Sequence, residues 1–458
     1  MRKRRGRKFD KSGPLVDRIE GTLPFKLTGA QQNAIAEIYG DMESEGRMLR
    51  LLQGDVGSGK TAVALMALAK AIQSGAQGAL MAPTEILARQ HYEGLKDFLA
   101  AAGLRMELLT GRLKGKKRAA LLQDLAAGDI HVLVGTHALF QDDVIYHDLG
   151  IAVIDEQHRF GVHQRLALSA KGRPDKGGVD VLVMTATPIP RTLALTAYGD
   201  MDVSIIAEKP PGRKPIVTRA IDVERLDDIA NSLSRKLQDG ERIYWVCPLV
   251  EESEVMDLAA AEERYEYLNR LYPGQVGLVH GKMKGDEKDA AMTAFKNGET
   301  NILVATTVIE VGVDVPEATV MIIEHAERFG LAQLHQLRGR VGRGGLEGSC
   351  LLIYAGPLGE TQKSRLKIMR ETEDGFLIAE EDLRLRGSGE FLGTRQSGLP
   401  TFRLADLAHH SNLLHIARND AKHFLDQDPE LQTDRGAAIR TLLYLFERDS
   451  AIRYLQSG

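Results

Sequence analysis

Short apolar runs and longer amphipathic segments alternate through the first part of the chain. The apolar runs are strand-like, and the segments between them carry a helical pattern. Short apolar strands separated by helical patterns are typical of a parallel sheet that is covered by helices on both faces. The predicted strands are 48–52, 78–82, 105–109, 131–134, 151–154 and 179–184, and the predicted helices are 30–42, 62–72, 84–101 and 116–127.

A second alternation of the same kind follows the segment 209–215, which is rich in proline and glycine and is typical of a linker. From residue 360 onward the pattern becomes helical. We therefore predict an α/β fold with two parallel-sheet lobes in tandem and a helical C-terminal domain. The later predicted strands are 242–249, 276–280, 301–306, 320–323 and 350–354, the later helices are 225–237, 258–271, 286–297, 331–338, 362–371 and 376–385, and a glycine-rich loop follows at 386–398.

These patterns divide the chain into four parts. We assign 1–22 to a basic N-terminal segment, 23–207 to the first lobe, 208–358 to the second lobe and 359–458 to the helical domain. Residues 1–8 carry many basic side chains and no apolar partner, so we expect the N-terminal segment to be mobile. A solvated tail and an arm that touches phosphates are both compatible with this composition.

The composition is ordinary for a globular protein, with 43% hydrophobic and 27% charged residues in 458. The net charge is −4, so contact with nucleic acid would have to come from a local basic surface. Only Cys247 and Cys350 occur, which excludes a disulfide framework and zinc-ligand spacing and indicates a reducing compartment. No apolar run approaches the roughly 18 residues of a membrane span, so we expect a cytoplasmic protein without a membrane partner.

The sequence GDVGSGKT joins an apolar run to a helix rich in alanine and leucine. It fits G-x-x-x-x-G-K-[ST], in which backbone N–H groups surround phosphate oxygens at a helix N-terminus. We expect Lys60 to reach the β- and γ-phosphates and Thr61 to bind Mg²⁺; a glycine-rich turn with an incidental lysine is the alternative. The candidate nucleotide-binding residues are Gly54, Asp55, Val56, Gly57, Ser58, Gly59, Lys60 and Thr61, with Gln31 placed to contact an adenine edge.

Two adjacent carboxylates, Asp155 and Glu156, follow the apolar run 151–154. Ligands of open parallel sheets lie at the carboxyl ends of strands, so these acids are candidates for a site. We expect Asp155 to hold Mg²⁺ through water and Glu156 to orient and deprotonate the attacking water. Adjacent acids in an ordinary loop are the alternative interpretation.

The sequence QLHQLRGRVGR places three arginines, Arg338, Arg340 and Arg343, around two glycines in the second lobe. Planar guanidinium groups on a stiff loop suit a triphosphate, and the only P-loop lies in the first lobe. We therefore expect a nucleotide to be completed across the cleft, as by an arginine finger. A basic helix that faces DNA remains the alternative.

Together these motifs resemble those of superfamily 2 helicases. The resemblance also rests on PTEILARQH (83–91), GTH (135–137), TATPIPRT (185–192) and ATTVIEVGVDVP (305–316), and it extends from about residue 23 to the C-terminus. DEQHRFGVHQR and the tail sequence IAEEDLRLRGSGEFLGTRQSG are similar to the RecG branch of this superfamily. Such a resemblance implies RecA-like lobes, the first for ATP binding, followed by a helical translocation domain.

The same resemblance implies an ATP-dependent helicase and double-stranded DNA translocase that remodels stalled replication forks and branched recombination intermediates. It implies ATP and Mg²⁺ as cofactors, branched or double-stranded DNA and a single-stranded DNA-binding protein as partners, and a monomer. It assigns catalysis to Lys60, Asp155, Glu156, Gln336, Arg340 and Arg343, a nucleotide contact to Asp314, and DNA contact or coupling to Pro83, Thr84, Gly111, Thr136, His137, Thr185, Thr187, His280, Gly281, Thr306 and Thr307 and, in the translocation motif, to Arg365, Arg386 and Gln396.

One feature departs from the family pattern. Family members carry a large N-terminal region with an oligonucleotide-binding wedge, and here only a short segment precedes Gln31. We therefore expect translocation on duplex DNA rather than fork separation by this chain alone. The alternatives are a nucleotide-switched DNA-binding module, the motor of a transcription-repair coupling factor, and an RNA helicase. Glu156, Arg340 and Arg343 favour turnover, and DEQH favours the RecG branch.

Overall fold

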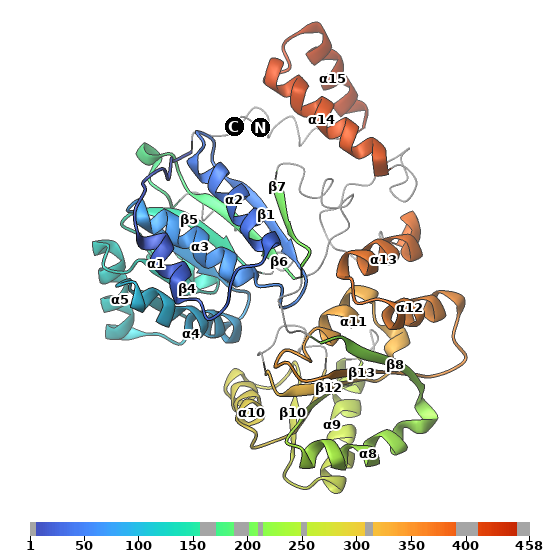
Figure 1. The fold of residues 1–458 in the computed structure, drawn as a ribbon. Coiled ribbons are helices and arrows are strands. Elements are labelled where there is room, and N and C mark those ends of the chain that lie inside the picture. The colour runs from blue at the N-terminus through green and yellow to red at the C-terminus, as the bar shows by residue number, and fades with distance from the viewer. Residues whose placement is uncertain are drawn as a thin grey trace.

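The computed structural model describes residues 6–155, 171–186, 201–208, 214–248, 254–306, 315–390 and 411–446. Within these ranges the chain forms two α/β lobes with parallel sheets and a helical C-terminal part, which confirms the predicted fold class (Figure 1). No helix in the described ranges has the length and apolar character that a bilayer span requires.

The first lobe is built on a parallel sheet with the strand order β3-β4-β2-β5-β6-β1-β7. Successive residues of a strand point to opposite faces, so Leu51 and Leu52 join separate apolar clusters. Helix α3 is buried along most of its length. The strands are β1 (Leu49–Gly54), β2 (Gln77–Met81), β3 (Met106–Leu109), β4 (Val132–Gly135), β5 (Leu149–Ile154), β6 (Asp180–Thr185) and β7 (Asp202–Ile206), and the helices are α1 (Leu15–Thr22), α2 (Gly29–Glu43), α3 (Lys60–Gln73), α4 (Glu85–Ala101) and α5 (Gly115–Ala127).

The N-terminal segment corrects the expectation of a mobile arm from residue 6 onward. Phe9 is fully buried in the core of the first lobe, and α1 buries Ile19 beside it. The Arg7 guanidinium donates to the buried Asp148 carboxylate over 2.8 Å, and Lys176 donates to the same oxygen over 2.7 Å. The buried Asp148 carboxylate thus holds Arg7 of the basic segment in place, and the composition of that segment alone could not indicate such a partner. Residues 1–5 lie outside the described ranges.

The second lobe repeats the layout with a parallel sheet in the order β10-β11-β9-β12-β13-β8. The edge strands β7 and β8 of the two sheets were missed by the sequence prediction. Within the described residues each pairs with one neighbour, and polar, partly exposed residues interrupt both strands, so neither contains a continuous apolar run. The strands are β8 (Ile216–Asp222), β9 (Arg242–Val246), β10 (Val276–Val279), β11 (Ile302–Ala305), β12 (Ala318–Ile323) and β13 (Gly348–Tyr354), and the helices are α8 (Leu226–Gln238), α9 (Glu254–Leu271), α10 (Gly285–Asn297) and α11 (Leu331–Arg338).

The C-terminal part contains α12 (Glu360–Glu371), α13 (Gly375–Glu390), α14 (Ser411–Gln427) and α15 (Asp434–Leu445). Leu366, Met369 and Ile378 pack in the core of the second lobe, so α12 and α13 rest on that lobe. Helices α14 and α15 lie apart from it (Figure 1). The predicted loop 386–398 begins as helix, because α13 continues through its first two glycines to Glu390.

Candidate nucleotide and nucleic-acid site

The candidate residues of the first lobe follow the carboxyl ends of its parallel strands, which meet at one edge of the sheet. The P-loop follows β1, and Asp155 follows the nearby strand β5, so the nucleotide candidates share one half of this edge. Three DNA candidates lie in the other half, where Thr84 follows β2, Gly111 follows β3 and Thr136 follows β4. A further candidate, Thr185, ends β6 between β5 and β1 and so lies beside the nucleotide candidates.

The P-loop has the backbone that phosphate binding requires. Gly57 and Gly59 adopt φ values of +76° and +83°, in the left-handed region that residues with a Cβ atom rarely adopt. Lys60 opens α3, and its ammonium group donates to the carbonyl oxygens of Gly54 and Asp55 over 2.8 and 2.9 Å. Thr61 is the next residue of the helix. The loop thus fits a phosphate group, with its lysine folded against it and the helix N-terminus behind it.

Gln31 is held between helix α2 and the P-loop. Its side-chain oxygen accepts from the Thr28 N–H and its backbone N–H donates to the Thr28 hydroxyl, which forms a capping box. Its amide group donates to the Ser58 carbonyl over 2.9 Å. Gln31 therefore contacts the loop itself, which the sequence did not reveal.

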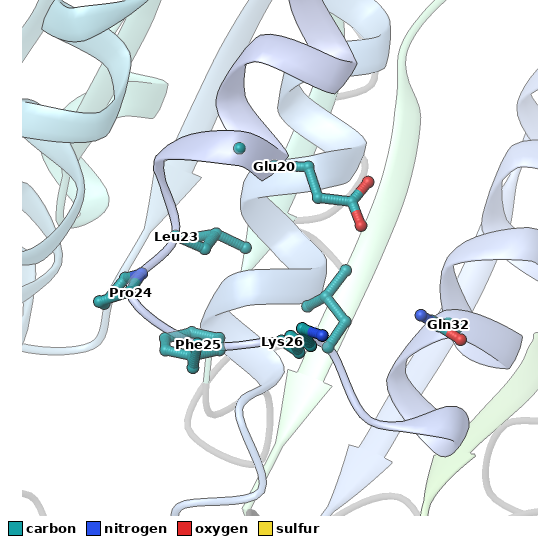
Figure 2. A pocket seen from close by; sticks show the side chains of 8 residues that line it. Glu20, Leu23, Pro24, Phe25, Lys26 and Gln32 are labelled. Atoms are coloured by element: carbon teal, nitrogen blue, oxygen red, sulfur yellow. The ribbon is translucent and has the colours of Figure 1, made fainter.

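A cavity of about 500 Å³ lies beside the start of α2. Figure 2 shows Leu23, Pro24, Phe25 and Lys26 on the segment that precedes the helix and Gln32 on the helix opposite them. The Phe25 side chain is 51% exposed there. The lining of this partly apolar cavity includes Gln32, the neighbour of Gln31 in α2, but no residue of the P-loop.

Asp155 has a partner that the sequence analysis missed. Its carboxylate lies 2.7 Å from Nε2 of His91, which projects from α4, and both side chains are largely buried. An imidazole at this distance fixes the carboxylate at the sheet edge. Spacing gave no signal for this pair, because α4 and β5 meet only in the folded lobe. Glu156 lies outside the described residues.

Helix α11 of the second lobe reaches the P-loop of the first. His335 Nε2 lies 2.7 Å from Asp55 Oδ1. A Cβ atom added to Gly339 would lie only 2.9 Å from the Val56 Cβ, so the backbone of the arginine-bearing segment approaches the P-loop closely. The Arg343 side chain donates to the Gly339 carbonyl over 3.0 Å. These contacts place the segment that carries the catalytic candidates Gln336, Arg340 and Arg343 next to the P-loop.

Arg338 does not join that group, contrary to the sequence interpretation. Its side chain is 2% exposed and donates to the carbonyl oxygens of Met369 and Thr372 at the end of α12. Burial lowers the pKa of its guanidinium from the ordinary value. Arg338 is therefore a contact between the second lobe and the C-terminal helices.

The DNA candidates of the two lobes lie at equivalent strand ends. Thr84 caps α4, and the Gly111 N–H donates to the Glu85 carboxylate over 3.0 Å. In the second lobe, His280 follows β10 and Thr306 follows β11. The other DNA candidates at strand ends are Pro83 and His137 in the first lobe, Thr185 at the end of β6 and Gly281 after β10.

Two of these side chains carry unmet hydrogen-bonding capacity. Among the described residues, His280 Nδ1 and Thr306 Oγ1 are buried atoms without a hydrogen-bond partner, and so is Arg365 Nε in α12. Unpaired buried polar atoms are uncommon and call for a physical explanation. A bound ligand at these strand ends is one such explanation.

A second contact between the lobes, made by Arg112, was not predicted. Arg112 pairs with Glu85 of its own lobe and with Asp286 and Asp289 of α10, over 3.1, 3.2 and 2.8 Å. It lies in an exposed basic segment, GRLKGKKR, next to Gly111. In the second lobe the short loop GKMK (281–284) follows β10 before α10 begins, and GRLK (111–114) stands at the same place before α5, so both lobes present short basic loops at their DNA-candidate ends.

Thr187, Thr307, Asp314 and Gln396 lie outside the described residues. The backbone of Arg386 belongs to the glycine-containing end of α13, and its side chain lies outside the described part of the structure.

Comparisons with known proteins agree with this arrangement. A family model of the DEAD/DEAH box helicase matches residues 28–196, the helicase conserved C-terminal domain matches 223–345, and domain 3, C-terminal, of the ATP-dependent DNA helicase RecG matches 372–448. RecG of Escherichia coli strain K12 is 51% identical over 418 residues, which are 91% of this chain and 60% of that protein. RecG of Bacillus subtilis is 52% identical over 92% of this chain and 61% of its own length.

Solved structures give the same result. RecG bound to a three-way DNA junction matches with a TM-score of 0.75 and 43% identity, over 90% of this chain and 53% of that one. Dbp5 of S. cerevisiae, at 16% identity and a TM-score of 0.58, covers 81% of this chain and 94% of that one and shows the fold alone. The chain thus spans about three-fifths of the length of the curated relatives that it matches.

Proposed function

This chain is a homologue of the RecG helicases, and we propose that it is an ATP-driven motor that moves along double-stranded DNA. The observation that carries the proposal is the approach of the arginine-bearing segment of the second lobe to the P-loop of the first, through His335 and Gly339. A site divided between two lobes can open and close as the nucleotide changes, and such closure moves the DNA-candidate ends relative to each other.

We assign the chemistry to residues of both lobes. Lys60 and the P-loop N–H groups hold the phosphates, and the cavity beside Phe25 receives the adenine ring. Thr61 and Asp155 would hold Mg²⁺, which would neutralise charge on the phosphates. Glu156 orients and deprotonates the attacking water, and Arg340 and Arg343, with Gln336 and Asp314, stabilise charge on the transferred phosphoryl group.

We propose double-stranded and branched DNA as the substrate. Support comes from the relative that is bound to a three-way DNA junction and from the basic loops of both lobes. Thr185, Thr187 and Thr307 would couple the nucleotide to the DNA track, and Arg365, Arg386 and Gln396 would transmit closure to the duplex. We further propose a cytoplasmic monomer that works with a single-stranded DNA-binding protein.

Displacement of a third strand from a triplex on linear duplex DNA tests the proposed function. We expect displacement that requires ATP and Mg²⁺ and that Lys60→Ala abolishes, because the loop then lacks its phosphate-binding ammonium group. A chain that binds duplex and hydrolyses ATP without displacing the third strand would contradict a translocase.

A further inference from the structure

His91 of helix α4 contacts a carboxylate to which the proposed function gives a metal-binding role. Its Nε2 lies 2.7 Å from Asp155 Oδ2, and the two side chains are only 11% and 13% exposed. Hydrogen bonds between largely buried polar groups are strengthened by the low local dielectric, and breaking one leaves its partner unsatisfied. The contact therefore restricts where the Asp155 carboxylate can lie.

The chemistry of the two groups gives the hydrogen bond its direction. An ionised carboxylate can only accept, so Nε2 of His91 carries a proton and donates it to Oδ2 of Asp155. Only those rotamers of Asp155 that keep Oδ2 against the imidazole preserve this bond. Because both carboxylate oxygens lie in one plane with their carbon atom, the bond also defines the position of Oδ1.

The backbone under both side chains is fixed. The Asp155 N–H donates to the Met81 carbonyl over 2.8 Å, which continues the pairing of β5 with β2 beyond the last residue of β5. Leu87 and Leu95 lie four positions before and after His91 and are buried in the core of the first lobe. Residues four apart share one face of a helix, so His91 belongs to the face of α4 that packs on the sheet.

The first turn of α4 is anchored as well. The Thr84 hydroxyl accepts from the Leu87 N–H, which caps the helix, and the Glu85 carboxylate accepts from the Gly111 N–H over 3.0 Å. A helix that is held at its first turn and along its apolar face presents His91 in one position. The imidazole is therefore a rigid support for Asp155.

The position of Asp155 decides between a packing role and a functional role for this pair. A histidine and an aspartate that served only to satisfy each other could lie anywhere inside the lobe. Asp155 instead follows the carboxyl end of β5, at the edge of the parallel sheet where ligands bind. The bond thus orients a carboxylate at that edge.

Mg²⁺ makes the orientation of this carboxylate important. Thr61 in the first turn of α3 and Asp155 after β5 supply a hydroxyl and a carboxylate, and oxygen atoms are the ligands that Mg²⁺ prefers. Mg²⁺ requires near-ideal octahedral geometry, so a carboxylate that serves it, directly or through water, must be held in a defined orientation. Removing a hydrogen-bond partner of a metal ligand typically costs about 10- to 100-fold in metal affinity or activity.

We propose that His91 is a positioning residue that orients the Asp155 carboxylate for the Mg²⁺ that accompanies ATP. The imidazole touches neither the metal nor the nucleotide in this role. The inference rests on the proposed function and adds to its metal site a residue for which the sequence analysis predicted no role.

The test compares the Mg²⁺ dependence of AMP-PNP binding in the full chain and in His91→Leu, which removes the donor at similar volume. The Kd of AMP-PNP is measured by calorimetry in excess EDTA and in excess Mg²⁺, and the first value divided by the second is the metal ratio. His91→Gln keeps an N–H donor on a side chain of similar length. His147→Leu, the same substitution at an exposed histidine of the first lobe, is the matched control.

Asp155→Asn, alone and combined with His91→Leu, tests whether His91 acts through the carboxylate. Substitutions that act through one group are not additive, whereas independent ones are. Once Asp155 is replaced, the loss of His91 should therefore leave the metal ratio unchanged.

We expect a large metal ratio in the parent and in His147→Leu. His91→Leu should lower the ratio by about tenfold, with the Kd in EDTA unchanged because the P-loop contacts remain, and His91→Gln should keep most of the parental ratio. A parental ratio in folded His91→Leu, an equal loss of affinity with and without Mg²⁺, or a further loss in the double variant would overturn the inference. A parent that does not bind AMP-PNP, or binds it equally well without Mg²⁺, would instead overturn the proposed function.

Discussion

Gly339→Ala tests whether the close approach of the two lobes at the P-loop is needed for turnover. Gly339 has φ −65°, so alanine is compatible with its backbone and the effect of the change is purely steric. The new Cβ would lie 2.9 Å from the Val56 Cβ and 3.2 Å from both Val56 methyl groups. Carbon atoms prefer separations of about 3.5–4.0 Å, so the segment must withdraw from the P-loop by roughly 0.6–1.1 Å.

A withdrawal of this size is large for a catalytic group. A misplacement of about 1 Å can lower a rate on the order of 10²-fold. We therefore expect Gly339→Ala to lower kcat for ATP hydrolysis by roughly 10- to 100-fold, with little change in the affinity for AMP-PNP, because the P-loop contacts within the first lobe remain.

The assay is steady-state ATP hydrolysis with saturating linear duplex. Gly40→Ala is the control, since a Cβ at that helical glycine meets nothing within 4 Å. A second substitution, Val56→Gly, removes the opposing side chain and should restore part of the lost rate in Gly339→Ala. Parental kcat in Gly339→Ala would refute the reasoning, because the lobes would then not need this approach during turnover.

Three further predictions concern single residues. Glu156→Gln should bind ATP yet lose most hydrolysis, as seen by comparing nucleotide binding with single-turnover hydrolysis; parental hydrolysis would remove Glu156 as the base. Arg340→Ala or Arg343→Ala should lower kcat on the order of 10³-fold if these residues act as arginine fingers. Burial raises the pKa of Asp180 to about 8, so the folded state keeps a proton that the unfolded state releases and stability falls as pH rises toward that value. In Asp180→Asn the side-chain oxygen still accepts from the Met48 N–H. The Tm of this variant minus the Tm of the parent, measured by calorimetry, should therefore increase from pH about 5 to pH about 8. A difference in Tm that does not depend on pH would contradict this.

The interior of both sheets could be predicted because it depends on apolar runs. Strands such as β5 are buried on both faces and therefore read as continuous apolar sequence. The strands β7 and β8 were missed because polar residues interrupt the apolar ones along them, as in DVSII and IVTRAID. The order of the N-terminal segment depends on the buried Asp148, far along the chain from Arg7.

The candidate site was predictable where one local motif carries the chemistry, as in the P-loop. It was not predictable where the partner comes from another lobe or helix. His91 pairs with Asp155, and His335 pairs with Asp55, through contacts that only the folded chain creates. Arg338 shares a motif with Arg340, yet its position on α11 directs it to α12 instead of the P-loop. Motif membership therefore did not determine the role of each arginine.

The most direct test of the account is the steady-state ATPase rate with Mg²⁺ and no nucleic acid, single-stranded DNA, linear duplex or a model fork. A motor divided between two lobes that tracks duplex DNA should hydrolyse ATP slowly alone and be stimulated strongly by linear duplex and by the fork, and less by single strands. Equal rates under all four conditions, or stimulation by single strands alone, would contradict it.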